Sequence, residues 1–232
     1  MSLFFNKEDG YYSLTTLGTG TFVALIAVLI VLTAFLKNRD EAEEVAPTNP
    51  KVFSTKQLVF SAAAIALGFA TSYIKIVPMP WGGSITLCSM LFVTLIGYWY
   101  GPKIGIIAGF AYGLLQFLQD GGSYILSPLQ ACLDYILAFA ALGLSGFFYQ
   151  KANGLMKGYI FAILIRGLLH TIGGYLYWMD YMPESFPQSL AIIYPIAYNY
   201  SYILAEGLIT IILLALPPVK SAMTRVKKLA IE

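Results

Sequence analysis

Apolar residues occur in seven long runs along the chain, and short polar or glycine- and proline-containing segments separate these runs. The runs are Leu17–Leu36, Gln57–Val77, Ile85–Trp99, Ile104–Leu118, Pro128–Tyr149, Gly158–Trp178 and Leu190–Leu216. A bilayer core about 30 Å thick is crossed by about 20 apolar residues of helix, which most of the runs supply. The two shorter runs, on either side of Gly101 and Pro102, are tilted or partly interfacial helices in this interpretation. The pattern predicts an all-α integral membrane protein with seven spans.

A charged segment, Lys37–Lys56, divides the chain into two unequal parts, because it is too polar to build a core of its own. Residues 1–56 are therefore predicted to be an accessory N-terminal transmembrane helix with a cytoplasmic linker. Residues 57–232 are predicted to form a six-helix membrane domain. The alternative for the first run is a cleaved signal peptide. The leader Met1–Ser13 argues against it, because it carries Lys7 against Glu8 and Asp9 and lacks a clear small-residue cleavage site.

Composition agrees with a membrane protein: 58% of the 232 residues are hydrophobic and 11% are charged, whereas a soluble domain has about 25% charged residues. The net charge is only +2, and the basic residues form no stripe outside the short connections and the tail. A nucleic-acid partner is therefore not expected. Cys88 and Cys132 both lie within apolar runs, so we interpret them as packing residues rather than a disulfide.

The basic residues predict the orientation, because cytoplasmic connections of membrane proteins are enriched in lysine and arginine. They lie on alternate connections, at Lys37, Arg39, Lys51, Lys56, Lys103, Lys151, Lys157, Lys220, Arg225, Lys227 and Lys228. The opposite connections, 79–84, 120–127 and 179–189, contain no lysine or arginine. We expect a multi-pass protein of the cell membrane with its N-terminus outside and its C-terminus in the cytoplasm.

Several ionisable or polar residues interrupt the apolar runs, and a charge at mid-membrane costs about 2.5 to 3.5 kcal/mol on insertion scales. A helical rise of about 1.5 Å per residue places Asp134, His170 and Asn199 in one layer, about 10 to 14 Å below the outer surface. Arg166 and Glu206 lie in a deeper layer. Because their charges are opposite and their depths similar, we expect them to neutralise each other as a buried pair.

If Arg166 pairs with Glu206, Asp134 has no evident protein cation in its own layer. A cationic ligand would complete this site. Aromatic residues surround it, with Tyr194 above Asn199 and Trp81, Tyr124 and Trp178 at the outer rim, so the ligand is expected to be flat. His170 and Asn199 could exchange hydrogen bonds with a heterocycle. These residues predict a pocket for a small, aromatic, positively charged molecule.

Each pocket residue also has a structural interpretation. Tryptophans and tyrosines commonly anchor membrane proteins at the surface, and an intramembrane histidine can join helices. Asp134 could instead carry protons, or it could pair with Lys75, which lies near the outer end of the span Gln57–Val77.

Small residues follow one face of the span Gln57–Val77, where Ala62, Ala66 and Ala70 recur every four residues. Such a face lets another helix approach closely. That helix belongs either to this chain or to a membrane partner.

From about Gln57 to the C-terminus, the chain resembles the thiamine-specific substrate-binding component of bacterial energy-coupling factor transporters. The resemblance is carried by Ala62 and Ala66, by the segments Pro80–Gly83 and Asp134–Phe139, and by the spacing of Arg166, His170, Trp178, Tyr194 and Asn199. It implies a six-helix protein that captures thiamine from outside and performs no chemistry. The implied thiamine-binding residues are Trp81, Tyr124, Asp134, Tyr135, His170, Trp178, Tyr194 and Asn199. The implied partners are a transmembrane coupling protein, which would contact Ala62, Ala66 and Ala70, and two ATPase subunits.

Two other functions compete with thiamine capture. The first is a proton-coupled secondary transporter of a small cationic aromatic compound, with Asp134 and His170 as a proton relay. The second, an intramembrane enzyme, has less support, because a single histidine without a clustered acidic pair forms neither a metal site nor a nucleophile with its base. No cofactor or metal is expected. The chain also lacks the phosphate-binding pattern G-x-x-x-x-G-K-[ST], so any ATPase must be a separate subunit.

Overall fold

The computed structural model describes residues 3–8, 11–21, 23–24, 53–80, 82–120 and 125–232. Near the N-terminus, β1 (Phe5–Glu8) and β2 (Tyr11–Leu14) form an antiparallel hairpin in which Phe5 pairs with Leu14. Residues 16–21 are helical. Most of the predicted span Leu17–Leu36 and of the charged segment lies outside the described residues. The division of the chain at residue 56 therefore stays a prediction.

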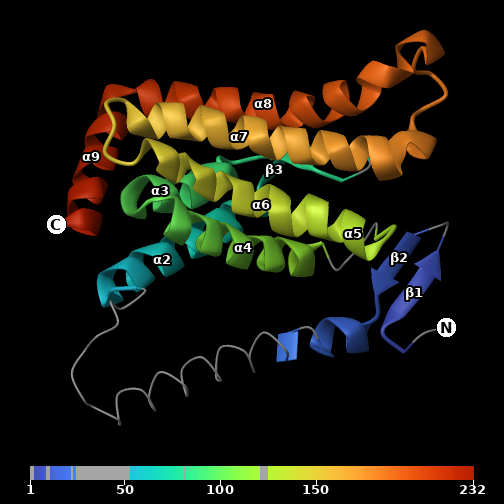
Figure 1. Cartoon of the computed structure of the whole chain (residues 1–232), viewed down its shortest axis with the longest axis horizontal. Helices are drawn as coiled ribbons and strands as arrows, with labels where there is room; N and C mark the ends of the chain where they lie inside the picture. Colours follow the sequence, from blue (N-terminus) through green and yellow to red (C-terminus); the bar gives the residue numbers. More distant parts are fainter. Residues whose placement is uncertain (1–2, 9–10, 22, 25–52, 81, 121–124) are drawn as a thin grey trace.

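From residue 54 onward the described chain is mostly helical, and its long helical segments follow the order of the last six predicted spans. The first three are α2 (Thr55–Ser72), α3 (Ser89–Tyr100) and α4 (Pro102–Gln119). The fourth is a composite of α5 (Pro128–Ala131), η1 (Cys132–Leu137), α6 (Ala138–Ala140) and η2 (Ala141–Phe148). The fifth consists of α7 (Gly154–Gly173), η3 (Gly174–Trp178) and η4 (Met179–Tyr181), and the sixth of η5 (Gln188–Ile193) and α8 (Tyr194–Ala215). Figure 1 shows α7 and α8 running side by side along the length of the molecule.

Local sequence signals account for two of the helix starts. Ser54 and Gln57 form a capping box at the start of α2, in which the Ser54 side chain accepts from the Gln57 N–H and the Gln57 side chain accepts from the Ser54 N–H. Pro102 begins α4, where its missing N–H would have had no helical partner. The cut at Gly101 and Pro102 that the sequence predicts is confirmed.

The core is built around α3, which packs against α2, α4, η2 and α7. Val93 and Ile96 are fully buried on α3, and Leu142 on η2 is buried equally. Helices α4 and η2 approach each other closely where two glycines meet: a Cβ at residue 143 would lie 2.0 Å from the carbonyl carbon of Gly105. Small residues permit this close approach. Helices in a membrane depend on such packing, because lipid tails are as apolar as the side chains and burial of apolar surface alone does not favour association.

A hairpin replaces the predicted helical end of the second span. Helix α2 ends at Ser72, and β3 (Lys75–Pro78) then pairs antiparallel with β4 (Ser84–Thr86). The prediction of helix as far as Val77 is wrong, because the β-branched pair Ile76 and Val77 precedes Pro78, and both features favour extended backbone. Ile85, the predicted start of the next span, likewise belongs to β4.

A second element that the sequence analysis did not predict is α9 (Pro217–Ile231), which follows α8 after Leu216. Figure 1 shows α9 lying across the end of the bundle. The Tyr100 hydroxyl donates to the carbonyl oxygen of Ala230 at 3.1 Å, and Lys227 Nζ donates to the Tyr98 hydroxyl at 2.9 Å. These contacts hold the basic C-terminal segment against the end of α3.

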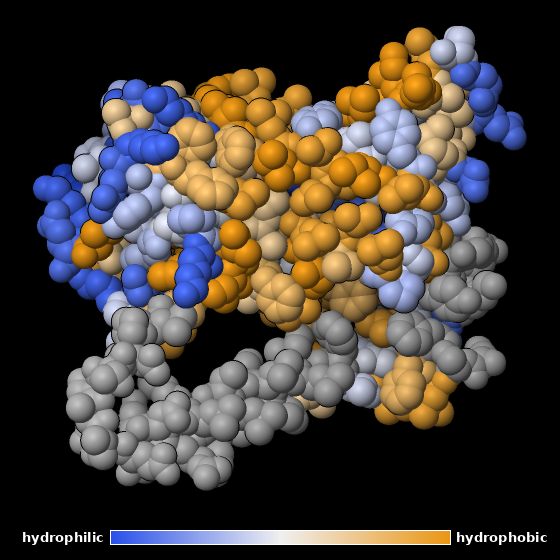
Figure 2. All heavy atoms as spheres, viewed as in Figure 1, coloured by the Kyte–Doolittle hydropathy of each residue, from blue (hydrophilic) through white to orange (hydrophobic). Residues whose placement is uncertain are grey.

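Three helical segments of the described chain are long and apolar enough to cross a membrane: Pro128–Phe148, Gly154–Tyr181 and Gln188–Ala215. Along α7 and η3, every fourth residue is an exposed apolar one: Ile160, Leu164, Leu168, Ile172 and Leu176. Figure 2 shows hydrophobic residues over this face of the molecule and hydrophilic residues at the α9 end. The chain is therefore a multi-pass membrane protein. The exact number of seven spans stays a prediction.

Candidate functional site

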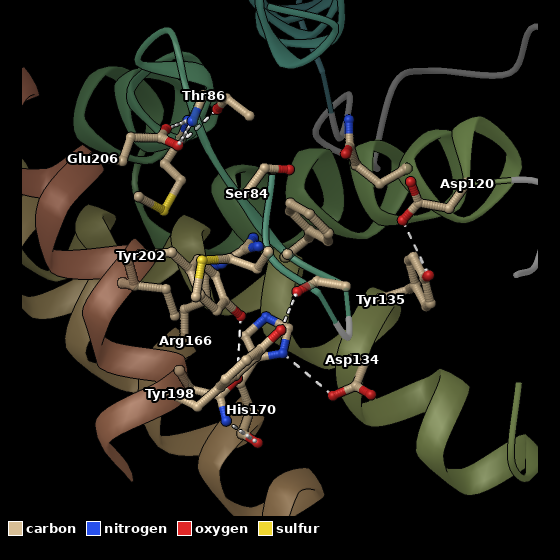
Figure 3. A pocket seen from close by; sticks show the side chains of 18 of the residues that line it. Ser84, Thr86, Asp120, Asp134, Tyr135, Arg166, His170, Tyr198, Tyr202 and Glu206 are labelled. Atoms are coloured by element: carbon tan, nitrogen blue, oxygen red, sulfur yellow. Dashed lines mark hydrogen bonds and ion pairs between the residues drawn. The ribbon is translucent and has the colours of Figure 1, made fainter. Parts of the chain in front are cut away.

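A cavity of about 500 Å³ opens between the β3–β4 hairpin and helices α3, α4, η1, α7 and α8 (Figure 3). The residues lining it include six of the eight predicted binding residues: Asp134, Tyr135, His170, Trp178, Tyr194 and Asn199. They come from three helical segments and line one cavity, and their role in ligand binding stays a prediction. The other two, Trp81 and Tyr124, lie outside the described residues, so their place at the rim stays a prediction.

Asp134 is held by three side chains at one end of the cavity. Its Oδ2 accepts hydrogen bonds from Gln130 Nε2 at 2.6 Å and from Trp178 Nε1 at 3.3 Å, and its Oδ1 lies 3.2 Å from His170 Nδ1. Gln130 was not among the predicted site residues, although its position four residues before Asp134 on one helix is a signal that could have found it. Within the described residues, no lysine or arginine forms a salt bridge with Asp134.

The contact with Asp134 determines which nitrogen of His170 carries the proton. An ionised carboxylate only accepts hydrogen bonds, so in the neutral form of His170 the Nδ1 atom is the donor and Nε2 presents a lone pair. His170 Nε2 is buried and has no hydrogen-bond partner among the residues that the structure describes. One acceptor of the site is therefore left for a ligand.

Two π-helical turns shape the cavity wall. Asp134 and Tyr135 lie in η1, and Gly174 and Trp178 lie in η3. The extra residue in a π-helical turn rotates neighbouring side chains, and such turns are frequent at functional sites. The glycine at residue 173 is also needed, because a Cβ at this position would lie 2.9 Å from Asp134 Oδ1.

Asn199, a predicted binding residue that lines the cavity, also forms hydrogen bonds within the protein. Its Nδ2 donates to the carbonyl oxygens of His170 at 3.2 Å and Pro195 at 2.9 Å, and its Oδ1 accepts from the Tyr202 hydroxyl at 3.2 Å. Both amide hydrogens are therefore used within the protein. Asn199 joins α7 to α8 and fixes the position of the His170 backbone.

One wall of the cavity is aromatic. Tyr194, Tyr198 and Tyr202 follow one another at every fourth position of α8, with ring centroids 5.8 and 6.2 Å apart. The Tyr198 hydroxyl donates to the carbonyl oxygen of Gly82 at 3.1 Å, which connects this wall to the β3–β4 hairpin. The sequence analysis did not identify Tyr198 and Tyr202 as site residues, although their spacing from Tyr194 already places them on the same helix face.

The predicted pairing of Arg166 with Glu206 is wrong. Among the described residues, Arg166 forms no salt bridge: Lys75 pairs with Asp120, and neutral His170 contacts Asp134 through a hydrogen bond. The Glu206 carboxylate instead accepts from the backbone N–H groups of Thr86 at 2.9 Å and Met90 at 3.1 Å, and from the Thr86 hydroxyl at 2.6 Å. It thus caps α3 from outside, where a helix N-terminus attracts negative charge.

Arg166 is 8% exposed and its guanidinium lies over the Phe139 ring, 3.9 Å from the centroid. This cation-π contact occupies the face of the guanidinium. Nε and Nη1 are both buried and have no hydrogen-bond partner in the described part of the chain. Arg166 also lines the cavity, so the site contains unpaired hydrogen-bond donors in addition to the unpaired acceptor His170 Nε2.

A second polar group of the cavity is the pair of Lys75 and Asp120, whose Nζ and Oδ1 are 3.9 Å apart. The proposed alternative pairing of Lys75 with Asp134 is therefore wrong. Lys75 reaches the cavity because α2 ends early and Lys75 belongs to β3. Burial raises the pKa of Asp120, while Lys75 and a hydrogen bond from Tyr135 act in the opposite direction.

Comparisons with known proteins agree with this arrangement. A family model described as thiamine transporter protein matches residues 58–226. The chain is 32% identical over 171 residues to the thiamine transporter ThiT of Bacillus subtilis (strain 168), a match that covers 68% of this chain and 85% of the relative. It is 36% identical over 92 residues to ThiT of Lacticaseibacillus paracasei, covering 33% of this chain and 46% of the relative. A solved structure of ThiT from Listeria monocytogenes matches with a TM-score of 0.55 and 28% identity, covering 70% of this chain and 94% of that one.

Proposed function

Because this chain belongs to the thiamine transporter protein family, we propose that it captures thiamine outside a bacterial cell and delivers it for ATP-driven uptake through an energy-coupling factor module. The family is one of transporters rather than enzymes. The observation that carries the proposal is the charge of the cavity lining. It contains the cations Lys75 and Arg166 and the anions Asp120, Asp134 and Glu206.

With His170 neutral, these groups leave one uncompensated negative charge. A buried charge without a counterion is costly in a low-dielectric environment, and a monocation in the cavity would balance it. Thiamine is such a cation. Its thiazolium ring carries the charge, and the flat rings suit an aromatic cavity of this size.

Asp134 is the anion best placed to contact the ligand. The Glu206 carboxylate is used by α3, and Asp120 is paired with Lys75. The partners of Asp134 are neutral side chains, so its charge is hydrogen-bonded but not neutralised. Trp178 and the tyrosine wall supply stacking surface. In this proposal Tyr135 and Asn199 shape the site, while Trp81 and Tyr124 close its rim.

A thiamine titration of the purified, detergent-solubilised protein tests this function. A ligand stacked on Trp178 should quench tryptophan fluorescence, and the titration needs no proton gradient. Riboflavin and biotin serve as control ligands, because neither carries the positive charge. Binding that requires a proton gradient would contradict the proposal and favour the proton-coupled transporter.

For uptake, we propose that the exposed face of α2 docks to a transmembrane coupling protein that carries two ATPase subunits on separate chains. Ala62, Ala66 and Ala70 are all exposed, whereas Ala64 and Gly68 on the neighbouring stripe are buried. The small side chains therefore lie on the outer surface of the bundle rather than in its internal packing. Such a face suits close approach by a partner helix.

Replacing Ala66 with Trp is expected to reduce thiamine uptake strongly and to leave thiamine binding unchanged, because the indole blocks helix approach far from the cavity. Uptake into cells and titration of the purified variant measure the two effects. Leu208→Trp is the matched control, since residue 208 is 60% exposed on α8. Uptake by Ala66→Trp equal to that of this control would contradict the docking proposal.

We further propose that residues 57–232 form the substrate-binding domain, that residues 1–56 form an accessory helix and linker, and that the N-terminus lies outside. The basic residues of α9 support this orientation, because they would then lie at the cytoplasmic surface. In a cysteine-free variant, a membrane-impermeant thiol reagent should label a cysteine at Ser2 in intact cells and not one at Ser221. The reverse labelling would invert the topology.

A further inference from the structure

Two neighbouring side chains of α7 leave hydrogen-bonding atoms unpaired inside the cavity. In the described part of the chain, several buried side-chain nitrogens and oxygens have no hydrogen-bond partner. Three of these atoms belong to residues that line the cavity: Arg166 Nε, Arg166 Nη1 and His170 Nε2. Arg166 and His170 are four residues apart, so they lie on the same helix face about 6 Å apart along the axis. Figure 3 shows both side chains in the cavity.

The unpaired atoms have opposite hydrogen-bonding roles. An arginine side chain only donates, so Nε and Nη1 require acceptors. His170 Nε2 is an acceptor, because Nδ1 uses its hydrogen on Asp134. The cavity therefore presents donors and an acceptor one helical turn apart.

Within the described residues, no protein group pairs with these atoms. The oxygens of Glu206 are occupied by Thr86 and Met90, and those of Asp134 by Gln130, Trp178 and His170. The Phe139 ring covers the face of the Arg166 guanidinium, but the N–H bonds lie in the guanidinium plane and remain available. Leaving buried polar atoms unpaired is costly, so a ligand that pairs them gains affinity from both.

We infer that Arg166 is a specificity-determining residue that, together with His170, recognises the 4-aminopyrimidine ring of the ligand. The ring nitrogen next to the amino group accepts a hydrogen bond from Arg166, and the amino group donates one to His170 Nε2. The inference rests on the proposed function, because it takes thiamine as the ligand. It gives Arg166 a contact with the ligand in place of the predicted contact with Glu206.

The test uses two ligands that differ only at this edge. In oxythiamine the amino group is replaced by a carbonyl and the neighbouring ring nitrogen carries hydrogen, so donor and acceptor are exchanged while the positive charge is kept. The parent protein is expected to bind thiamine more tightly. In Arg166→Met the preference for thiamine should fall by about ten-fold or more, because one charge-assisted hydrogen bond is lost for thiamine alone.

The ratio of the two affinities separates recognition from a structural role. Removing the Arg166 charge affects both cationic ligands alike, so a parallel change in both affinities would overturn the inference. Arg166→Lys keeps a donor and is expected to retain most of the preference. If the parent binds no thiamine, the proposed function itself fails; if it does and the preference survives in Arg166→Met, only the role of Arg166 is wrong.

A second measurement needs no variant, in case Arg166→Met does not fold. A thiamine analogue with CH in place of the ring nitrogen next to the amino group keeps its shape, charge and amino group. The parent protein should bind this analogue about ten-fold or more weakly than thiamine. Equal affinities would overturn the inference.

Discussion

Replacing Asp134 with Asn is expected to weaken thiamine binding by about ten-fold to more than a hundred-fold. The substitution keeps the size of the side chain and removes its charge, and a charge-assisted contact contributes roughly 1.5 to 3 kcal/mol. Asp134 is only 15% exposed at its side chain, so solvent screens the interaction weakly. Fluorescence titration of the parent and the variant measures the change. A neutral thiamine analogue should be affected much less.

Asp120→Asn is the matched control for this prediction. It removes the same formal charge from the same cavity, but Asp120 is paired with Lys75 and its side chain is 37% exposed. Solvent screening should limit its effect to a few-fold. Equal losses in both variants would show that only the total charge of the cavity matters. Wild-type affinity in Asp134→Asn would remove Asp134 from thiamine recognition.

Glu206→Leu is expected to lower the free energy of unfolding by about 3 kcal/mol or more. The substitution leaves the backbone N–H groups of Thr86 and Met90 buried without an acceptor, and each such group costs about 1 to 3 kcal/mol. Glu206 is 2% exposed, so water does not readily replace it. Glu206→Gln keeps an oxygen acceptor and should be less damaging. Denaturation of the detergent-solubilised variants, followed by circular dichroism, measures these differences.

Combining this substitution with Arg166→Met tests the corrected role of both charges. In a direct buried pair, removing either partner strands the other, and removing both restores stability. Because Glu206 caps α3 instead, the double variant is expected to be no more stable than Glu206→Leu alone. A double variant close in stability to the parent would indicate that Arg166 and Glu206 meet in the membrane.

The local sequence pattern identifies the chain as a membrane protein and identifies several of the residues that line its cavity. Long apolar runs identify membrane helices whatever their neighbours, because the cost of placing polar groups in lipid applies to each segment separately. The polar residues within those runs, Asp134, His170 and Asn199, had to face away from lipid. Their similar depths follow from the fixed rise of a helix. For this reason the three residues line one cavity in the structure, while their contact with a ligand stays a prediction.

The partners of these residues depended on the three-dimensional arrangement. Depth alone made Glu206 a plausible counterion for Arg166, yet Thr86 in β4, 120 residues earlier in the chain, provides closer donors to Glu206. Likewise Lys75 enters the cavity because β3 replaces the last turns of a predicted helix. Hydropathy and helical rise give a residue its depth and its face, but not its distance from groups on other elements. The choice among several possible partners for a buried charge is therefore made by tertiary packing.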